Sequence, residues 1–533
     1  MAHPHLLSRL IQPSRQIQAS IKSIRSFTNT TSALAKVDLI RPNHKSLNLD
    51  DVNHFRAIFK DRPGSVLSSL ENDPKRIEKF DLEAFNNDWL NKYHGNSQLV
   101  LKPKTTEEVS KIVSYCVKNR LAICPQGGNT GLVGGSVPVF DEIIVNLSGL
   151  SNIRSFDETS GIITVDSGCV LQSVDDFLKS KGFIFPLDLG AKGSCHIGGN
   201  IATNAGGLRL LRYGSLHGSV LGLEVVLPDE DGTILSNGMK CGLRKDNTGY
   251  DLKQLFIGSE GTLGIITGAT VLTPPRPVTT NVALLPVDNY DTIKEIYALC
   301  RQKLGEILSA FEFFDQSCFN VVLRHTQQAN PFSDPQSQGF YVLIETSGSN
   351  KEHDEQKLES LMEALLERSI VADGILAQDE TQFNSIWSFR ELIPESLGKH
   401  GPTYKYDLSI PMPLMYSLVE QTRQRLIEHG LLSPDGSEGD LIKCVSGYGH
   451  VGDGNLHLNI VAKRWDPKVE SVLEPWIYEL VTSYNGSISA EHGVGLMKLP
   501  YIKFSKDSKN LSILKSLKGL FDPFSILNPN KFI

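Results

Sequence analysis

The stretch that decides the fold reads Pro125-Gln126-Gly127-Gly128-Asn129-Thr130-Gly131-Leu132-Val133-Gly134-Gly135-Ser136. Five of the nine residues from 127 to 135 are glycine, and so many glycines cost conformational entropy on folding. In return, the backbone N–H groups of such a loop are exposed and can converge on an anion, because no Cβ stands in the way. The stretch therefore indicates an anion-binding cradle; the alternative is a series of tight turns in a β-rich domain.

Two further glycine-rich loops follow. Residues 190–207 include Gly198-Gly199-Asn200-Ile201-Ala202-Thr203-Asn204-Ala205-Gly206-Gly207, and the third loop reads Gly258-Ser259-Glu260-Gly261-Thr262-Leu263-Gly264. Three loops in one region indicate a single extended ligand, such as a dinucleotide, that the backbone contacts along its length. None of the loops has the G-x-G-x-x-G pattern that opens a Rossmann helix, and no Walker A sequence occurs, so a nicotinamide cofactor in a Rossmann fold is disfavoured.

Apolar periodicity predicts alternating strands and helices at 95–185, which indicates α/β or α+β packing, and an α+β region beyond residue 277; the expected fold class is α+β. A proline-rich break at 273–277 separates the glycine-rich region from a second region, in which we expect helices on one face of a sheet. Thr105 or Thr106 is the expected N-cap of the first long helix. The expected strands are 99–103, 121–124, 143–147, 162–165, 221–227, 264–269, 281–286, 339–345, 403–410 and 443–446; the expected helices are 105–120, 170–181, 291–303, 351–367 and 414–429, and residues 45–90 look helical.

Length and composition exclude several classes of protein. The chain has 533 residues, of which 40% are hydrophobic and 21% charged, which are the values of a globular protein with several domains. No run approaches the roughly 18 apolar residues of a membrane-spanning helix. The formal net charge is −7 and no long Lys/Arg run occurs, so we expect no nucleic-acid partner.

The first 37 residues differ from the rest of the chain. They carry five Lys/Arg residues, many Ser and Thr, apolar residues at near-helical spacing and no acid before Asp38. This composition is typical of a mitochondrial transit peptide, with the matrix as destination; the alternative is a basic tail. The eight cysteines form no C-x-x-C pair, so we expect buried, reduced thiols, as in the matrix.

The three loops, together with Leu527-Asn528-Pro529-Asn530-Lys531, resemble the FAD-binding domain of the vanillyl-alcohol oxidase/PCMH family. Residues 211–218 and 239–250 are similar to its D-2-hydroxyglutarate dehydrogenase branch, and the resemblance covers nearly the whole chain after about residue 50. It implies a PCMH-type FAD domain at 95–275 that residues 467–533 complete, an inserted α+β substrate domain at 276–466 and an N-terminal helical segment at 38–94.

The resemblance also implies the residues that contact FAD. Some relatives attach the flavin to a histidine in the first loop, where this chain has Gly127-Gly128-Asn129-Thr130, so noncovalent FAD is expected. The implied FAD contacts are Pro125, Gly127, Gly128, Asn129, Thr130, Gly131, Gly134, Gly135, Ser136, Asp188, Gly190, Ser194, Gly198, Gly199, Thr203, Asn204, Gly207, Glu260, Gly261, Gly264, Ile266 and Asn528.

A second signal is a cluster of histidines near the end of the second region. His450 and His457 flank the turn-forming residues 452–455, and such a turn lets both imidazoles converge from adjacent strands. Two histidines and a carboxylate such as Glu491 make an open Zn²⁺ site, although other divalent metals suit the same ligands. Taken singly, these histidines are also consistent with structural or surface roles; the resemblance makes His450, His457 and Glu491 the metal ligands.

Such a metal suits the oxidation of a 2-hydroxy acid, because it lowers the pKa of a bound hydroxyl. His492 would then take the hydroxyl proton, and the hydride would pass from C2 to flavin N5. The resemblance makes Arg390, Lys405, Asn459 and His492 the substrate-binding residues, and a guanidinium suits a carboxylate. Pro394 stands where animal relatives have a hydroxyl residue, so one substrate contact differs.

The resemblance implies FAD- and metal-dependent oxidation of D-2-hydroxyglutarate to 2-oxoglutarate, with pyruvate (giving D-lactate), electron-transfer flavoprotein or cytochrome c as electron acceptor. The alternative within the fold is a cytochrome-linked D-lactate dehydrogenase. From other classes, a zinc hydrolase with a nucleotide substrate would be colourless, and an actin-related scaffold would not need His450 and His457. The oligomeric state, a homodimer included, stays open.

Overall fold

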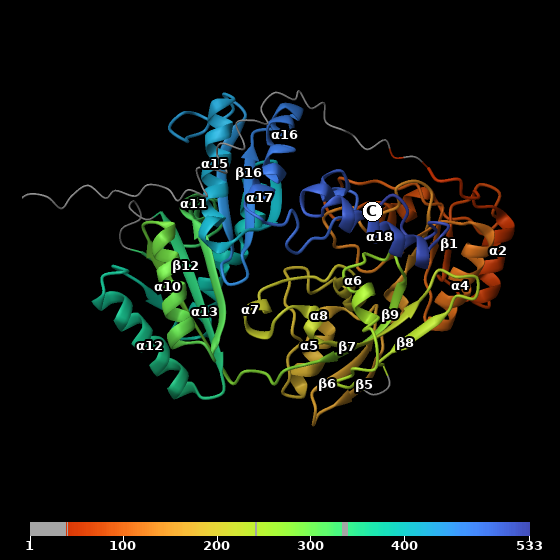
Figure 1. The fold of residues 1–533 in the computed structure, drawn as a ribbon, viewed down its shortest axis with the longest axis horizontal. Coiled ribbons are helices and arrows are strands. Elements are labelled where there is room, and N and C mark those ends of the chain that lie inside the picture. Colours follow the sequence, from red (N-terminus) through yellow and green to blue (C-terminus); the bar gives the residue numbers. More distant parts are fainter. Residues whose placement is uncertain (1–38, 40, 240–241, 333–338) are drawn as a thin grey trace, which may run out of the picture.

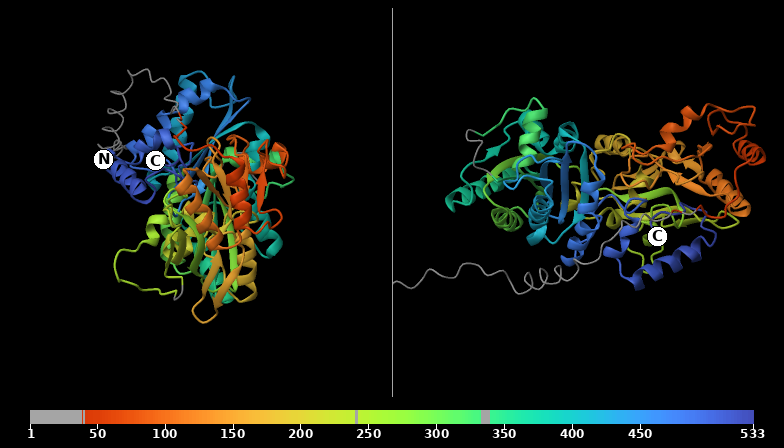
Figure 2. Two further views of the ribbon diagram at one scale, coloured as in Figure 1. Left: turned by 90° about the vertical axis from the view of Figure 1, so that its right-hand side faces the viewer. Right: turned by 90° about the horizontal axis from the view of Figure 1, so that it is seen from above.

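The computed structural model describes residues 39, 41–239, 242–332 and 339–533, so the leader expected at 1–37 and Cys241 lie outside the described residues. Three sheets organise this part of the chain (Figures 1 and 2). In Figure 1 the largest sheet occupies the left half of the molecule, and the two smaller sheets occupy the right half. The α+β expectation is confirmed.

The first sheet has four strands in the order β1-β2-β4-β3 and leads into the first glycine loop. Strands β2, β4 and β3 are parallel, and β1 is an antiparallel edge. Helix α4 packs on this sheet through apolar side chains at helical spacing, and Thr105 caps it by accepting from the backbone N–H of Glu108. The elements are α2 (Leu49–Ile58), β1 (Val66–Ser68), α3 (Glu83–Asn86), β2 (Leu99–Leu101), α4 (Thr106–Asn119), β3 (Ile123–Gln126) and β4 (Ile143–Asn146).

The second sheet is antiparallel and has the order β5-β6-β9-β7-β8. Helices α5 and α6 pack on it and bury Leu171, Val174, Leu178, Ile197 and Ile201. The second glycine loop contains α6, and the third lies just before β9. The elements are β5 (Ile153–Asp157), β6 (Ile162–Asp166), α5 (Leu171–Ser180), α6 (Ile197–Ala202), α7 (Leu210–Tyr213), α8 (Leu216–Ser219), β7 (Val220–Val226), β8 (Ile234–Asn237), α9 (Lys253–Phe256) and β9 (Ile265–Leu272).

The third sheet is antiparallel and has seven strands in the order β13-β10-β12-β11-β15-β16-β14. The expectation of helices on one face is wrong, because separate apolar cores cover both faces: α10, α12 and α15 on one, α11, α13 and α14 on the other. The elements are β10 (Thr279–Val287), α10 (Tyr290–Lys303), β11 (Leu308–Asp315), α11 (Gln316–His325), β12 (Phe340–Gly348), α12 (Lys351–Glu367), β13 (Ile375–Leu376), α13 (Glu380–Glu391), α14 (Ile393–His400), β14 (Thr403–Ser409), α15 (Met415–Glu428), β15 (Ile442–His450) and β16 (Asn455–Ala462).

The C-terminal segment returns to the first sheet. After α16 (Pro467–Leu473), α17 (Trp476–Ser483) and α18 (Ser508–Phe521), Leu527 forms a parallel bridge with Ile123. The backbone N–H of Asn528 donates to the Ile123 carbonyl at 2.8 Å. Residues more than 400 positions apart in the chain therefore pair side by side, next to the first glycine loop.

The segment 45–90 is less helical than expected. It holds α2, a 3₁₀ turn at Lys79–Leu82 and the four-residue α3, whereas β1 pairs with β2. Pro63-Gly64 and Pro74 explain the difference, because proline and glycine interrupt helices. Six of the seven described cysteines are buried, and Cys444 is half-buried.

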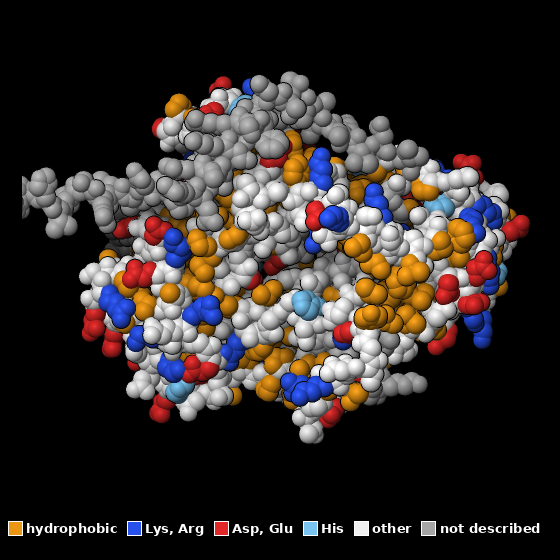
Figure 3. Space-filling model, viewed as in Figure 1, with side chains coloured by type: hydrophobic (Ala, Val, Ile, Leu, Met, Phe, Trp, Pro, Cys, Tyr) orange, Lys and Arg blue, Asp and Glu red, His pale blue; other side chains and the backbone are white. Residues whose placement is uncertain are grey.

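The surface agrees with the composition. On the face drawn in Figure 3, Lys and Arg are interspersed with Asp and Glu and form no continuous basic field. Within the described ranges, no helix is long and apolar enough to cross a membrane.

Candidate active site

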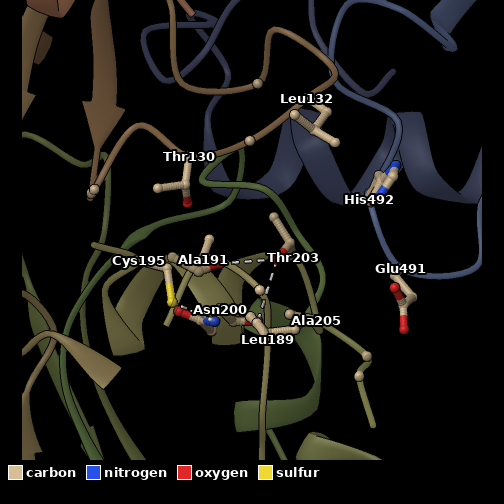
Figure 4. Close-up of a pocket in the computed structure, with 18 of the residues that line it drawn as sticks. Thr130, Leu132, Leu189, Ala191, Cys195, Asn200, Thr203, Ala205, Glu491 and His492 are labelled. Carbon is tan, nitrogen blue, oxygen red and sulfur yellow. Dashed lines mark hydrogen bonds between the residues drawn. The ribbon is translucent and has the colours of Figure 1, made fainter. Parts of the chain in front are cut away.

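A cavity of about 870 Å³ lies between the glycine loops and one face of the seven-stranded sheet. This volume is in the range of ligand and cofactor sites. The three glycine loops form one wall, and β11, β14, β15 and β16 contribute side chains to the other. Figure 4 shows Glu491 and His492 beside the loop residues Thr203 and Ala205. We call the side formed by the three glycine loops the glycine-loop wall, and the side formed by the strands the sheet wall.

Most residues implied for FAD line this cavity. The exceptions are Gly134, Ser194 and Asn204. Gly134 has φ +71° and packs against the Tyr93 ring, and Asn204 has φ +47°. Ser194 supports the loop from behind, because its carbonyl oxygen lies where a Cβ on Gly128 would stand. The FAD contacts at these three positions stay predictions, because a loop has a ligand side and a protein side, which sequence does not distinguish.

The glycines of this wall serve two purposes. A Cβ at Gly128 or Gly207 would overlap a carbonyl oxygen, of Ser194 or Asp188 respectively, so these positions allow close backbone packing. Gly131, Gly190 and Gly199 also line the cavity, but a Cβ there would meet no protein atom within 4 Å. A side chain at these positions would enter open space. The wall is therefore shaped for a molecule that contacts backbone.

Three buried polar atoms line the same wall without a hydrogen-bond partner among the described residues: Ser167 Oγ, His196 Nδ1 and Asn200 Oδ1. Their residues are 1%, 8% and 5% exposed. Burial lowers the pKa of His196, which keeps its ring neutral. Because buried polar atoms are nearly always hydrogen-bonded, this wall fits a polar ligand such as FAD. Asn200 belongs to the second glycine loop, but the sequence did not single out Ser167 or His196, since an isolated Ser or His carries no motif.

The sheet wall follows from strand alternation. Successive side chains of a strand point to opposite faces, and in the β15–β16 hairpin Tyr448 lies opposite His457. His450, two residues from Tyr448, therefore shares a face with His457, although their separation is odd. Residues 451–454 form the turn, one residue earlier than the predicted 452–455, and Asn455 begins β16. The same face presents Glu312, Lys405, Asp407, Tyr448, His450, His457 and Asn459.

Ligand atoms of His450, His457 and Glu491 lie within 4.8 Å of one another. The Nε2 atom of His450 is 3.7 Å from Oε1 of Glu491, and this buried oxygen has no hydrogen-bond partner within the described ranges. Two imidazoles and a carboxylate facing a cavity form a donor set suited to a divalent metal with open positions. The three residues implied as ligands thus come together and fit a metal. Asp407, Glu491 and His492 form a second, overlapping group.

Glu312, which the sequence analysis did not predict, organises this cluster. Its carboxylate is 2.6 Å from Nδ1 of His450 and accepts from Nε of Arg390 at 2.9 Å. Burial opposes a charge on His450, but Glu312 outweighs it and raises the pKa of His450 to about 9. Because Nδ1 donates to Glu312, Nε2 is directed toward Glu491, the orientation that metal-binding histidines commonly have.

Asp407 explains how the neighbours Glu491 and His492 both face the cavity. Its buried carboxylate accepts from the backbone N–H of Glu491 at 2.9 Å and of His492 at 3.0 Å, and from Asn455 Nδ2 at 2.9 Å. Gly493 follows with φ +84°, which favours glycine. Burial lowers the pKa of His492, so its ring is neutral at pH 7 and can accept a proton.

Two cations face the cavity from the sheet side. Arg390 is buried, with its guanidinium carbon 4.5 Å from the centre of the Tyr448 ring, and only its Nε is bonded to Glu312. Lys405 lies opposite Asn459 in the β14–β16 register and makes no ion pair within the described part of the chain. Desolvation by the surrounding residues lowers the pKa of Lys405, although the residue remains exposed. Both cations are available to anionic groups in the cavity.

Comparison with known proteins agrees with this geometry. Residues 97–237 match the family described as FAD binding domain, and residues 276–532 match the C-terminal domain of FAD linked oxidases. Among solved structures, alkyldihydroxyacetonephosphate synthase has a TM-score of 0.68 at 16% identity, covering 97% of this chain and 92% of that one. p-Cresol methylhydroxylase has a TM-score of 0.68 at 16% identity, covering 92% of this chain and 98% of that one. The fold is therefore that of the PCMH-type FAD oxidases, and the cofactor is FAD.

Relatives in sequence define the family more closely. A mitochondrial protein of Schizosaccharomyces pombe whose name proposes D-lactate dehydrogenase activity is 54% identical, over 92% of this chain and 91% of its own length. Mitochondrial D-2-hydroxyglutarate dehydrogenase of Danio rerio is 50% identical, over 90% of this chain and 85% of its own length. D-2-hydroxyglutarate–pyruvate transhydrogenase of Saccharomyces cerevisiae is 43% identical, over 95% of this chain and 98% of its own length. The chain belongs to this family of FAD-linked D-2-hydroxy-acid oxidoreductases.

Proposed function

We propose that this protein oxidises D-2-hydroxyglutarate to 2-oxoglutarate with FAD and a divalent metal. The observation that carries the proposal is the presence of two available cations, Arg390 and Lys405, in the same cavity as the cluster of His450, His457 and Glu491. A dicarboxylate offers one anionic group to each cation and a hydroxyl to the cluster. The names of the Danio and Saccharomyces relatives support the same substrate.

His450, His457 and Glu491 would hold the metal, with zinc as the expected ion, and the glycine-loop wall would hold FAD without a covalent bond. When bound, the metal would supply a Lewis acid that lowers the pKa of the substrate hydroxyl, and FAD would supply the hydride acceptor. We also propose that 95–275 and 467–533 form one FAD domain, with the substrate domain 276–466 inserted between them; the bridge from Ile123 to Leu527 supports this division.

The chain's own residues bind, orient and deprotonate the substrate. His492, neutral because burial lowers its pKa, takes the hydroxyl proton. The Nη groups of Arg390, which have no hydrogen-bond partner among the described residues, bind one carboxylate, and Lys405 binds the other. Asn459 donates Nδ2 to the His457 carbonyl at 3.0 Å, which leaves its Oδ1 for the substrate. Asp407 and Glu312 hold these groups in place from behind.

The second candidate is a D-lactate dehydrogenase, favoured by the name of the Schizosaccharomyces relative. D-Lactate has one carboxylate, so it needs one of the two cations. Lys405 lines the cavity and makes no ion pair among the described residues, which argues for the dicarboxylate. The name of the Saccharomyces relative supports pyruvate as electron acceptor; electron-transfer flavoprotein and cytochrome c are the alternatives. We expect a mitochondrial location, in the matrix, from the leader at 1–37 and from the relatives' names.

Anaerobic bleaching of the visible flavin spectrum tests the proposal. Purified protein is mixed with D-2-hydroxyglutarate or with D-lactate, before and after treatment with a chelator. We expect D-2-hydroxyglutarate to bleach the flavin much faster than D-lactate does. This bleaching should stop after chelation and return when Zn²⁺ is restored. Faster bleaching by D-lactate would favour the second candidate. Bleaching that is insensitive to thorough chelation would refute the metal, and the absence of a yellow band from folded protein supplied with FAD would contradict the flavin assignment.

A further inference from the structure

The segment 491–495 carries both a proposed metal ligand and the proposed base, and it has little regular structure of its own. It lies between α17 and the 3₁₀ turn at Leu499–Phe504. Gly493 and Gly495 both have positive φ, of +84° and +51°. A segment of this kind has no helix or strand ladder to hold it, so its position depends on contacts with its neighbours.

Two buried carboxylates, one from each wall of the cavity, supply these contacts. On the sheet wall, Asp407 accepts from the N–H groups of Glu491 and His492. On the glycine-loop wall, Glu260 accepts from the N–H of Val494 through Oε1 and from that of Gly495 through Oε2, both at 2.7 Å. Four of the five backbone N–H groups of the segment are thus bonded to two side chains.

Glu260 itself belongs to the third glycine loop. It has φ +52°, is 8% exposed and lines the cavity beside Gly261. Its backbone N–H donates to the Ala202 carbonyl at 2.7 Å, and its own carbonyl accepts from Asn528 Nδ2 at 2.8 Å. Glu260 therefore links the FAD-contacting loops directly to the segment that carries Glu491 and His492.

We propose that Glu260 is a positioning residue that couples the two walls: FAD held by the glycine loops fixes segment 491–495 through Glu260 and thereby strengthens metal binding at His450, His457 and Glu491. Glu260 would touch no metal and no hydroxy acid, and it acts through the backbone of the segment. By thermodynamic linkage, bound metal strengthens FAD binding by the same factor. This inference rests on the proposed function, because it assumes the metal and FAD sites.

The glutamine variant is a sharp test, because a Gln side chain has one acceptor oxygen in place of two. Glu260→Gln can therefore accept from Val494 or from Gly495, but not from both in the same way. Glu224→Gln is the matched control. Glu224, in β7 of the same FAD-binding region as Glu260, is also a partly buried carboxylate. It is bonded to Arg154 and Thr106 and does not line the cavity.

Zn²⁺ affinity is measured by competition with a chromophoric chelator, for wild type and both variants, with saturating FAD and without FAD. We expect FAD to tighten Zn²⁺ binding of the wild type and of Glu224→Gln by about 10-fold or more, within the usual range of coupling. In FAD-loaded Glu260→Gln, we expect Zn²⁺ affinity about 10- to 100-fold below wild type, the usual effect of losing a group that positions ligands.

Hydrogen exchange of the backbone amides gives an independent readout. We expect FAD to slow exchange in a peptide covering residues 491–495 of the wild type and of Glu224→Gln, and not of Glu260→Gln. Saturating FAD, verified by absorbance, separates this effect from a weakened FAD site: a variant whose Zn²⁺ affinity and exchange match FAD-loaded wild type overturns the inference.

The inference is also overturned if wild-type protein binds Zn²⁺ with the same affinity in the presence and in the absence of FAD. This result does not depend on whether the variant folds. The proposed function fails in a different way, namely when wild type neither binds a divalent metal nor oxidises a 2-hydroxy acid. A wild type that does both, paired with a Glu260→Gln variant indistinguishable from it in both measurements, refutes only the coupling.

Discussion

The glycine-loop wall and the sheet wall of the cavity differ in what they offer a ligand. The first presents backbone, kept accessible by glycines such as Gly131 and Gly199. The second presents charged side chains, held from behind by the buried carboxylates of Glu312 and Asp407. Backbone recognition tolerates a long cofactor touched at many points, whereas the reaction needs a few groups at defined positions. Changes to the two walls should therefore have separable effects.

The largest effect on turnover is expected from His492→Asn on the sheet wall. Removing the proposed base should slow flavin bleaching by D-2-hydroxyglutarate by about 10²- to 10⁴-fold, as for other general bases. FAD content should stay at the wild-type level, because the glycine-loop wall is unchanged. Stopped-flow bleaching together with the flavin-to-protein absorbance ratio measures both. A variant that retains wild-type bleaching would remove His492 from the mechanism.

A smaller but more selective effect is expected from Lys405→Ala. Loss of one charged carboxylate contact should lower kcat/KM for D-2-hydroxyglutarate by about 10- to 100-fold, the usual effect of losing a hydrogen bond to a charged group, and should barely change kcat/KM for D-lactate. Lys399→Ala, an exposed lysine paired with Glu395, is the control. Steady-state kinetics with both acids measures the ratio. Equal losses on the two acids would contradict the assignment of Lys405 to a second carboxylate.

The glycine-loop wall is tested by two alanine substitutions of different kind. Gly128→Ala should lower the Tm of the FAD-free protein, because the new Cβ overlaps the Ser194 carbonyl. Gly131→Ala should leave that Tm unchanged, since no protein atom lies within 4 Å, but should weaken FAD binding by about 10-fold, because a methyl group displaces the ligand. Thermal melting and FAD titration measure the two quantities. A Gly131→Ala variant with wild-type FAD affinity would mean that FAD does not contact this position.

The smallest effect on turnover is expected at the ion pair of Arg154 and Glu224, two residues that do not line the cavity. Burial opposes the charge of Glu224, but hydrogen bonds from Arg154 and Thr106 outweigh it and lower the pKa of its carboxyl. A carboxyl whose folded pKa is lowered stabilises the protein above its unfolded pKa of about 4.3, and this contribution is lost as the pH falls through the folded value.

Glu224→Gln should therefore cost about 2 kcal/mol near pH 6 and progressively less below pH 4, with turnover unchanged. Differential scanning calorimetry of wild type and variant from pH 6 to pH 3 follows this difference. A destabilisation that is constant over the range would show that the charge of Glu224 does not contribute.

Local sequence was enough to anticipate the parts of the site that lie close together in the chain. Glycine density indicated the three loops, and the turn at 452–455 indicated that His450 and His457 converge. Helix α4 was expected at 105–120 and runs from Thr106 to Asn119. Glu312 and Asp407 were missed because each is an isolated acid within a strand. Their partners are distant, since His450 is 138 positions from Glu312, and Glu491 is 84 from Asp407.

By itself, the sequence determined the local chemistry of each wall: loops with little but backbone to offer, and a hairpin with two histidines. These are local properties, set by backbone freedom at glycine and by strand alternation. Only the tertiary structure decided which side of each loop faces the cavity and which carboxylates hold Arg390, His450 and segment 491–495. Those contacts depend on strand order and on the return of the C-terminal segment to β3, which bring together residues that are far apart in the chain.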